Sequence, residues 1–313
     1  MTNLSEFTFL SSDGKTQLHG MLWEPEGVAV RAVLQICHGV AEHIARYDGF
    51  ARALNEQGIV VAGHDHLGHG KSLPEGGTPV YFGQGNTWNT VVDDIYVLHQ
   101  RLKQRYPDVP LCIMGHSMGS FLTRTYLIRY PGTVKAAVIM GTGWQPQAAI
   151  TGGLALANAI AAVSGENATS ELVTELAFGS YNKLFAPNRT KVDWLSADES
   201  NVDDYIADPL CGADATVGLF RQMLHGIRFN QRQSHLRQMD REMPVLFVAG
   251  DKDPVGNCGK GVRQTYDAFR AAGMRDCTLK LYPGLRHEIL NEKAYTADIT
   301  KNIEAWLLSR LEK

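Results

Sequence analysis

The sequence lacks several features that define whole classes of protein. Its 313 residues contain 30 lysines and arginines against 33 aspartates and glutamates, a formal net charge of −3. Because there is no basic excess to neutralise a phosphate backbone, we expect no nucleic-acid partner. The five cysteines are scattered and include no C-x-x-C pair. This excludes a disulfide framework and predicts a reducing, cytoplasmic compartment.

Long apolar segments are also missing. Residues 1–7 have neither the positive region nor the apolar core of a secretory signal. The least polar stretch, 148–164, includes glycines and an asparagine and falls short of the roughly 20 apolar residues that span a bilayer. We therefore expect a soluble protein, and contact of this stretch with a lipid surface stays open. No internal repeat or low-complexity tail is present.

Apolar runs alternate with segments of helical spacing along most of the chain. Alternation of this kind predicts an α/β fold, a mostly parallel sheet with helices on both faces. The first two strands, separated by a Ser-Ser-Asp-Gly-Lys turn, indicate a hairpin. We predict strands at 7–10, 18–23, 31–37, 59–62, 111–114, 134–140, 244–249 and 278–282. We predict helices at 43–57, 87–105, 118–130, 260–272 and 294–311.

The alternation stops between residues 145 and 234. This interval has no clear strand; it is rich in alanine at first and acidic around 198–208. We interpret 145–234 as a helical cap inserted over the edge of a core formed by 1–144 and 235–313.

The sharpest motif is Gly115-His116-Ser117-Met118-Gly119, which matches G-x-S-x-G and lies between a predicted strand and a predicted helix. Ser117 would occupy a tight, strained turn that lifts its hydroxyl clear of the sheet. Side chains two residues to either side would collide, which explains Gly115 and Gly119. The pattern predicts that Ser117 is a nucleophile.

A serine hydroxyl attacks efficiently only when a base takes its proton. In this strand–turn–helix context the partners follow in the order acid, then histidine. His287 follows one late strand, and an acidic turn with Asp251 and Asp253 follows another. The base is therefore expected at His287, within hydrogen-bond reach of Ser117. Both aspartates compete for the acid role, and Asp253 is favoured by Pro254, which restricts the backbone of the turn.

Acyl transfer also requires hydrogen-bond donors for the developing oxyanion. The N–H of Met118, directly after the nucleophile, is one candidate. The second is the N–H of Val40, in the loop after the strand at 31–37, where Gly39 allows close approach of the backbone.

Five blocks, 38–47, 63–72, 115–119, 250–253 and 283–287, together resemble the monoacylglycerol lipase and lysophospholipase branch of the α/β-hydrolase fold. The resemblance covers both halves of the core and is weak across the cap. It implies a catalytic triad of Ser117, Asp253 and His287, with oxyanion donors from Val40 and Met118.

The same resemblance implies that Glu42 and Arg46 line a polar pocket for the alcohol part of an ester. Their spacing fits equally well an (i, i+4) ion pair at the start of a helix. Two positions depart from strict monoacylglycerol lipases. Leu290 stands where some of them have a second histidine. The acidic turn continues through residues 254–257 with a sequence that is associated with bacterial members.

These residues predict a serine hydrolase that cleaves single-chain acyl esters through an acyl-enzyme, with a small-molecule ester as its partner. An apolar cap would select acyl chains, since each buried methylene contributes about 0.8 kcal/mol. No metal and no organic cofactor is expected, because the histidines at 64, 66 and 69 lie in a glycine-rich turn without the usual ligand order.

Two alternatives stay open. The first is an aminopeptidase or small-amide hydrolase, which would need an acidic clamp from Glu42 or from the acidic stretch 198–204. The second is a catalytically silent hydrolase fold that binds a ligand or a protein.

Overall fold

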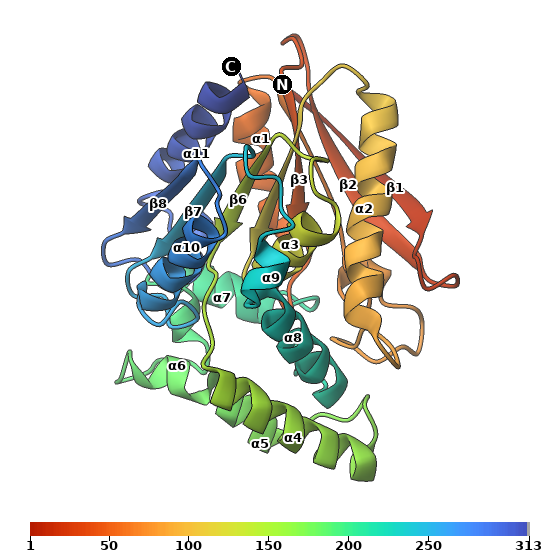
Figure 1. Cartoon of the computed structure of the whole chain (residues 1–313), viewed down its shortest axis with the longest axis vertical. Helices are drawn as coiled ribbons and strands as arrows, with labels where there is room; N and C mark the ends of the chain where they lie inside the picture. The colour runs from red at the N-terminus through yellow and green to blue at the C-terminus, as the bar shows by residue number, and fades with distance from the viewer. Residues whose placement is uncertain (312–313) are drawn as a thin grey trace.

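The computed structural model describes residues 1–311, and one eight-stranded sheet crosses the molecule (Figure 1). Its strand order is β1-β2-β4-β3-β5-β6-β7-β8. The strands are β1 Thr2–Leu10, β2 Gln17–Pro25, β3 Ala32–Cys37, β4 Ile59–His64, β5 Leu111–His116, β6 Ala136–Met140, β7 Val245–Gly250 and β8 Cys277–Tyr282.

The first two strands form the predicted hairpin, and β2 pairs antiparallel to β4. All pairings from β4 through β3, β5, β6 and β7 to β8 are parallel. The carboxyl ends of these six strands therefore meet at one edge of the sheet, where ligand sites of such folds lie.

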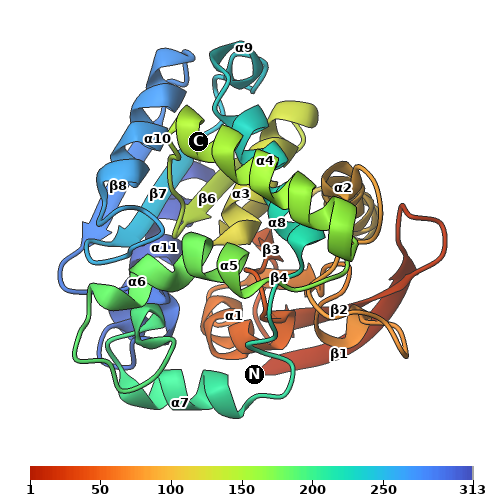
Figure 2. The ribbon, with the colours of Figure 1, turned by 90° about the horizontal axis from the view of Figure 1, so that it is seen from below.

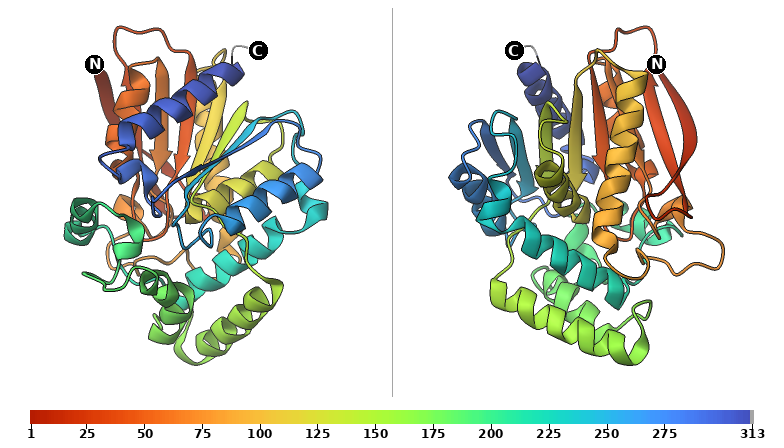
Figure 3. Two further views of the ribbon diagram at one scale, coloured as in Figure 1. Left: turned by 90° about the vertical axis from the view of Figure 1, so that its left-hand side faces the viewer. Right: turned by 45° about the vertical axis from the view of Figure 1, so that its right-hand side comes forward.

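Two layers of helices cover the sheet (Figure 3). The apolar residues of α1 and α11 pack on one face, whereas those of α2, α3 and α10 pack on the other. Successive residues of β3 alternate between the two cores: Leu34 and Ile36 belong to one, Val33 and Cys37 to the other. The bounds are α1 Asp48–Asn55, α2 Thr87–Arg105, α3 Met118–Arg129, α10 Lys260–Ala271 and α11 Thr296–Leu311, with single turns η1 Ile44–Tyr47, η2 Gly70–Ser72 and η5 Ile289–Asn291.

Helices of the interval 145–234, called the cap segment below, lie beyond the carboxyl edge of the sheet (Figures 1 and 2). They are α4 Gln147–Ser164, α5 Glu171–Thr174, η3 Glu175–Gly179, α6 Ser180–Lys183, η4 Asp193–Leu195, α7 Glu199–Ala207 and α8 Val217–Asn230. A further short helix, α9 Gln233–Leu236, straddles the predicted boundary at 234.

Helix α4 is longer and more apolar than we expected from the sequence. We expected this stretch to be too short for a membrane span, yet its 18 residues are long and apolar enough by length and composition. It is the one such helix among residues 1–311, which is weak evidence for a span. Its buried residues Ile150, Leu154 and Ala157 pack in the same apolar core as α3 and α8, so we describe it as a cap helix.

Most predicted elements are present, and α2 has the predicted bounds. The predicted helix at 43–57 is divided, because a single 3-10 turn precedes α1. The N–H of Ile44 donates to Asp65 Oδ1 (2.8 Å) rather than to a helical carbonyl. Asp65, in the turn that follows β4, thereby satisfies one of the N–H groups that the start of a helical segment leaves without a partner.

Candidate active site

Ser117 lies between β5 and α3 with backbone angles φ 54° and ψ −123°. A non-glycine residue in this region is strained by about 1–3 kcal/mol. The N–H of Ser117 donates to Met140 O at the end of β6 (3.1 Å), and the N–H and hydroxyl of Ser120 both donate to Ser117 O (2.8 and 2.6 Å). Neighbouring strand and helix therefore hold the turn in its strained form.

The two flanking glycines have no room for side chains. A Cβ added at Gly115 would lie 2.2 Å from Gly119 O, and one at Gly119 would lie 2.0 Å from Cys37 O. Both obstacles are backbone atoms, which cannot rotate away. The predicted collision is thus confirmed, and its cause at Gly119 is the end of β3, which packs against the turn.

Asp253 and His287 meet beyond the ends of β7 and β8. His287 Nδ1 donates to Asp253 Oδ1 (2.9 Å), and both side chains are buried, with 2% and 0% of their surface exposed. Asp251 is turned away and accepts a hydrogen bond from the N–H of Gly284 (2.7 Å). Of the two aspartates that the residues alone left open, Asp253 is the one beside the histidine.

A hydrogen bond between Ser117 and His287 is not formed in this structure. His287 Nε2 is buried and has no hydrogen-bond partner among residues 1–311. The nitrogen that faces away from Asp253 is therefore available to accept a proton. Catalytic hydrogen bonds are often long or misaligned before substrate binds, and rotation about the serine Cα–Cβ bond moves the hydroxyl without any change of backbone.

Two aromatic neighbours of His287 were not identified from the sequence. The ring of His116 lies 4.7 Å from the His287 ring, and the Trp194 ring lies 5.2 Å from it. His116 is the x of the G-x-S-x-G motif, so its place in the motif was a usable signal. Trp194 comes from the cap segment, where no pattern marked it.

An apolar cavity of about 390 Å³ opens beside Ser117. Val40 and Met118, the two predicted oxyanion donors, line it together with Ser117. The opposite wall comes from the cap segment, mainly from α4, η3 and α8. No aspartate or glutamate belongs to its described lining. The cap-side lining includes Ile150, Leu156, Ala157, Phe178, Tyr181, Trp194, Phe220 and Leu224.

Glu42 and Arg46 are part of a buried polar network and do not line this cavity. Arg46 donates to Glu42 (3.0 Å) and, through both terminal nitrogens, to Glu288 (2.7 and 2.8 Å). Glu42 also accepts from Tyr47 and His116, and from the N–H of Gly39. Glu42 and Arg46 border a separate cavity of about 140 Å³. The ion pair at (i, i+4) spacing is therefore present, with a third charged partner from far along the chain.

The charges of this network shift the pKa values of its members. Burial alone would raise the pKa of Glu42. The hydrogen bond with His116 and the charge of Arg46 outweigh burial, so the net effect is a lowered pKa. Burial also raises the pKa of Glu288, and Arg46 again reverses the sign. For His116, burial lowers the pKa, while the bond to Glu42 raises it overall. Both carboxylates are consequently held in their charged form.

The turn histidines differ in their hydrogen bonding. His69 Nδ1 donates to Leu67 O (2.9 Å) and the N–H of His69 donates to His66 O (2.9 Å), whereas neither ring nitrogen of His64 or His66 has a partner among residues 1–311. Burial lowers the pKa of His64 and of His69 to about 3, so these rings are neutral. Asp65 adds further hydrogen bonds, because its side chain accepts from the N–H groups of Ile44 and Lys71.

A buried arginine supports the loop after β6. Arg124 is fully buried; its Nη1 donates to Gly143 O (3.0 Å) and to Thr142 Oγ1 (3.3 Å). Burial lowers the pKa of Arg124 to about 9. A Cβ on Gly143 would lie 2.3 Å from Val255 O, so this loop packs directly on the turn that carries Asp253. The sequence offered no sign of this role.

Several known proteins of similar sequence are named as lipases. The chain is 30% identical to a monoacylglycerol lipase of Mycolicibacterium smegmatis, over 98% of each chain. It is 28% identical to a monoglyceride lipase of Mus musculus, over 96% of this chain and 90% of the mouse protein.

Solved structures give the same fold. A thermostable carboxyl esterase of Bacillus coagulans, solved in complex with glycerol, superposes with a TM-score of 0.92 at 26% identity, over 99% of this chain and 100% of the esterase. The family model of Hydrolase_4, described as serine aminopeptidase S33, matches residues 28–294. The chain has the α/β-hydrolase fold and belongs to this Hydrolase_4 family.

Proposed function

We propose that the protein is a serine hydrolase of carboxylic esters, with Ser117 as nucleophile, His287 as base and Asp253 as the acid that orients the base. The main support is the strained turn at Ser117, which opens onto an apolar cavity at the sheet edge that also carries the His287–Asp253 pair. The similar proteins named as lipases and carboxyl esterase support ester hydrolysis.

The proposed reaction has two steps. His287 Nε2 accepts the Ser117 proton as the hydroxyl oxygen attacks the ester carbonyl, and the N–H groups of Val40 and Met118 bind the oxyanion. The carbon–oxygen bond to the alcohol then breaks, and the alcohol leaves with that proton. Water, deprotonated by the same histidine, attacks the acyl-enzyme and releases the carboxylic acid. No step requires a cofactor.

The cavity favours a single acyl chain as the bound part of the substrate. Its lining is mostly apolar, and each methylene transferred from water into it contributes about 0.8 kcal/mol. We therefore propose monoacylglycerols, lysophospholipids or similar single-chain esters. If Glu42 and Arg46 contact the alcohol part, that part would reach the 140 Å³ cavity that they border together with His116.

The cap segment would form the entrance for these substrates. Six large apolar side chains of this segment are exposed, namely Val163, Leu172, Leu176, Leu184, Ile206 and Leu210, and α4 has no charged residue. We propose that residues 145–234 act as the cap and make transient contact with a lipid surface. All five cysteines are free, which is consistent with the proposed cytoplasmic location.

One observation weighs against an aminopeptidase. A substrate amine needs a nearby acidic group, yet the described lining beside Ser117 contains none. Glu42 is paired with Arg46, Asp198 accepts from Ser200, and Asp203 pairs with Arg189. A silent binding protein would have no need for a buried His–Asp pair beside a strained serine.

The test compares Ser117→Ala with the parent protein and with Ser164→Ala, a control at the exposed end of α4. Hydrolysis of an acyl p-nitrophenyl ester should fall by at least about 10³-fold in Ser117→Ala, with an unchanged melting temperature. An aminoacyl anilide should not be cleaved by the parent. Full esterase turnover in Ser117→Ala, or anilide cleavage that exceeds ester cleavage, would refute the proposal.

A further inference from the structure

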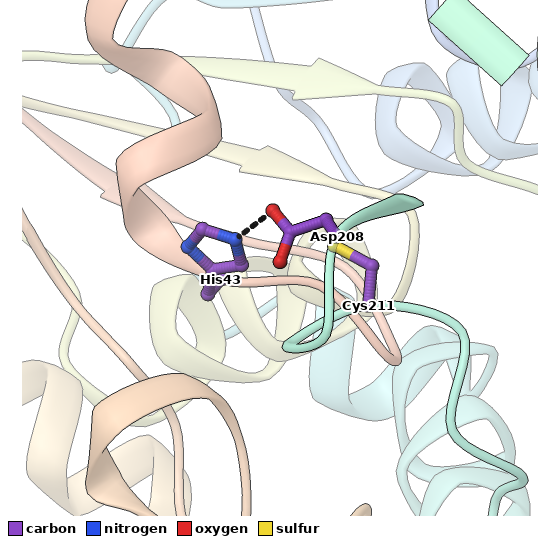
Figure 4. A group of neighbouring side chains, drawn as sticks. All are labelled: His43, Asp208 and Cys211. Carbon is purple, nitrogen blue, oxygen red and sulfur yellow. Dashed lines mark hydrogen bonds and ion pairs between the residues drawn. The ribbon is translucent and has the colours of Figure 1, made fainter. Parts of the chain in front are cut away.

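Three side chains that can bind metals meet where the cap segment touches the core. His43 comes from the loop after β3, and Asp208 and Cys211 follow α7. The His43 nitrogen, an Asp208 oxygen and the Cys211 sulfur lie within 4.8 Å of one another. Figure 4 shows the three side chains gathered around one point, with the imidazole facing the carboxylate.

Contacts outside the cluster hold these residues in place. The N–H of Gly212 and the hydroxyl of Tyr205 both donate to Ala41 O (3.0 Å each). The N–H of Leu210 donates to Asp208 Oδ1 (2.8 Å), which leaves Oδ2 to accept from His43 Nε2 (2.8 Å). The two backbone segments are thus joined without any contribution from the sulfur.

The charge around the cluster suits a cation. Arg46 is the positive group near Cys211, and it is paired with both Glu42 and Glu288. With Asp208, these groups sum to three carboxylates against one guanidinium. The local charge is therefore negative even while the thiol is protonated.

We propose that His43, Asp208 and Cys211 form a binding site for a divalent transition-metal ion, best matched by Zn²⁺, that joins the cap segment to the core. Nitrogen, oxygen and thiolate sulfur are the ligands that Zn²⁺ accepts, whereas Ca²⁺ and Mg²⁺ prefer oxygen alone. Tetrahedral bonds of about 2.0–2.3 Å place such ligands about 3.3–3.5 Å apart. Water fills the fourth position.

Binding requires small movements and the release of one proton. Tetrahedral coordination requires the distance between His43 Nε2 and Asp208 Oδ2 to increase by about 0.5 Å. The Cys211 sulfur moves toward the His43 nitrogen. The thiol proton passes to solvent, and the imidazole stays neutral because its proton moves from Nε2, which then binds the metal, to Nδ1. Because core and cap segment both supply ligands, the folded protein binds and the unfolded chain binds weakly, so occupancy raises the melting temperature.

The experiment uses the full chain after treatment with EDTA. Calorimetric titration with ZnCl₂ should give one ion per chain, together with an increase in melting temperature. Cobalt should produce a thiolate-to-metal absorption band. Each of Cys211→Ser, Asp208→Asn and His43→Gln should weaken Zn²⁺ binding at least tenfold and remove the increase in melting temperature. Cys258→Ser, at an exposed thiol outside the cluster, should bind like the parent.

Three results would overturn the proposal: no one-to-one binding by the parent, an undiminished cobalt band in Cys211→Ser, or loss of binding in Cys258→Ser. Melting curves in EDTA show whether each variant folds. No readout here depends on ester hydrolysis, so failure of the metal site and failure of the proposed function are distinguishable.

Discussion

Replacement of Arg46 by methionine tests the buried network beside the candidate site. The change keeps an unbranched side chain of similar length but leaves Glu42 and Glu288, whose side chains are 5% and 4% exposed, without their shared cation. Removal of one partner from a buried ion pair costs about 3–5 kcal/mol, because an unpaired charge remains buried. An unfolding entropy of about 2.1 cal/mol/K per residue over 313 residues is about 0.66 kcal/mol/K. The expected fall in melting temperature is therefore about 5–8 °C.

A matched control is present in the next helix. Arg52 and Asp48 form an ion pair at the same (i, i+4) spacing, 2.7 Å long, but their side chains are 47% and 41% exposed. Exposed pairs contribute at most about 1 kcal/mol, so Arg52→Met should lower the melting temperature by no more than about 1.5 °C. Circular dichroism or calorimetry of both variants measures the difference that burial makes.

The penalty in Arg46→Met should depend on pH. In the parent, Arg46 lowers the pKa of both glutamates, so their stabilising contribution is present above the unfolded pKa near 4.3 and is lost as pH falls through the lower folded values. Without Arg46, burial raises the folded pKa of Glu288, while Glu42 keeps its hydrogen bond with His116, so protonation of Glu288 then relieves part of the cost. The deficit relative to the parent should be smaller at pH 5 than at pH 8. A deficit equal to that of Arg52→Met, or one that grows toward pH 5, would refute this account.

Two further predictions concern the cavity and the nucleophile turn. If acyl methylenes enter the cavity, kcat/KM should rise by up to about fourfold per methylene, or about 200-fold from butanoyl to octanoyl p-nitrophenyl esters. Ala157→Phe, in the cavity wall, should shift the preferred acyl length to shorter chains. A kcat/KM that does not change with chain length would contradict the acyl assignment. Gly119→Ala would place a Cβ 2.0 Å from Cys37 O, so esterase activity should fall by more than 100-fold and the melting temperature should drop. Gly49→Ala is the control, because a Cβ there, inside a helix, meets nothing within 4 Å; it should stabilise the protein by about 0.5–1 kcal/mol. Equal changes in esterase activity and melting temperature in the two alanine variants would rule out the steric argument.

Local patterns in the sequence were sufficient for the fold and for the separate parts of the candidate site. Apolar runs of strand length and the helical spacing of α2 report burial directly, because each residue's face depends on near neighbours. At Gly115 the motif likewise specifies its own turn, because an added Cβ would meet Gly119 O, whereas at Gly119 the obstacle is Cys37 O of the distant strand β3. His287 could be located because it follows a predicted strand and parallel strands end at one edge of the sheet, whereas the choice of Asp253 over Asp251 relied on Pro254 and on the resemblance to known hydrolases.

Tertiary structure alone decided which distant groups meet. Glu288 joins the Glu42–Arg46 pair from 242 residues away, and Asp208 reaches His43 across 165 residues. Trp194 contacts His287 from a part of the cap segment where no sequence pattern marked it. These contacts depend on how the cap segment seats on the sheet edge, which is determined by packing summed over many residues. A single sequence carries strong signals for local backbone shape and only weak ones for such long-range neighbours.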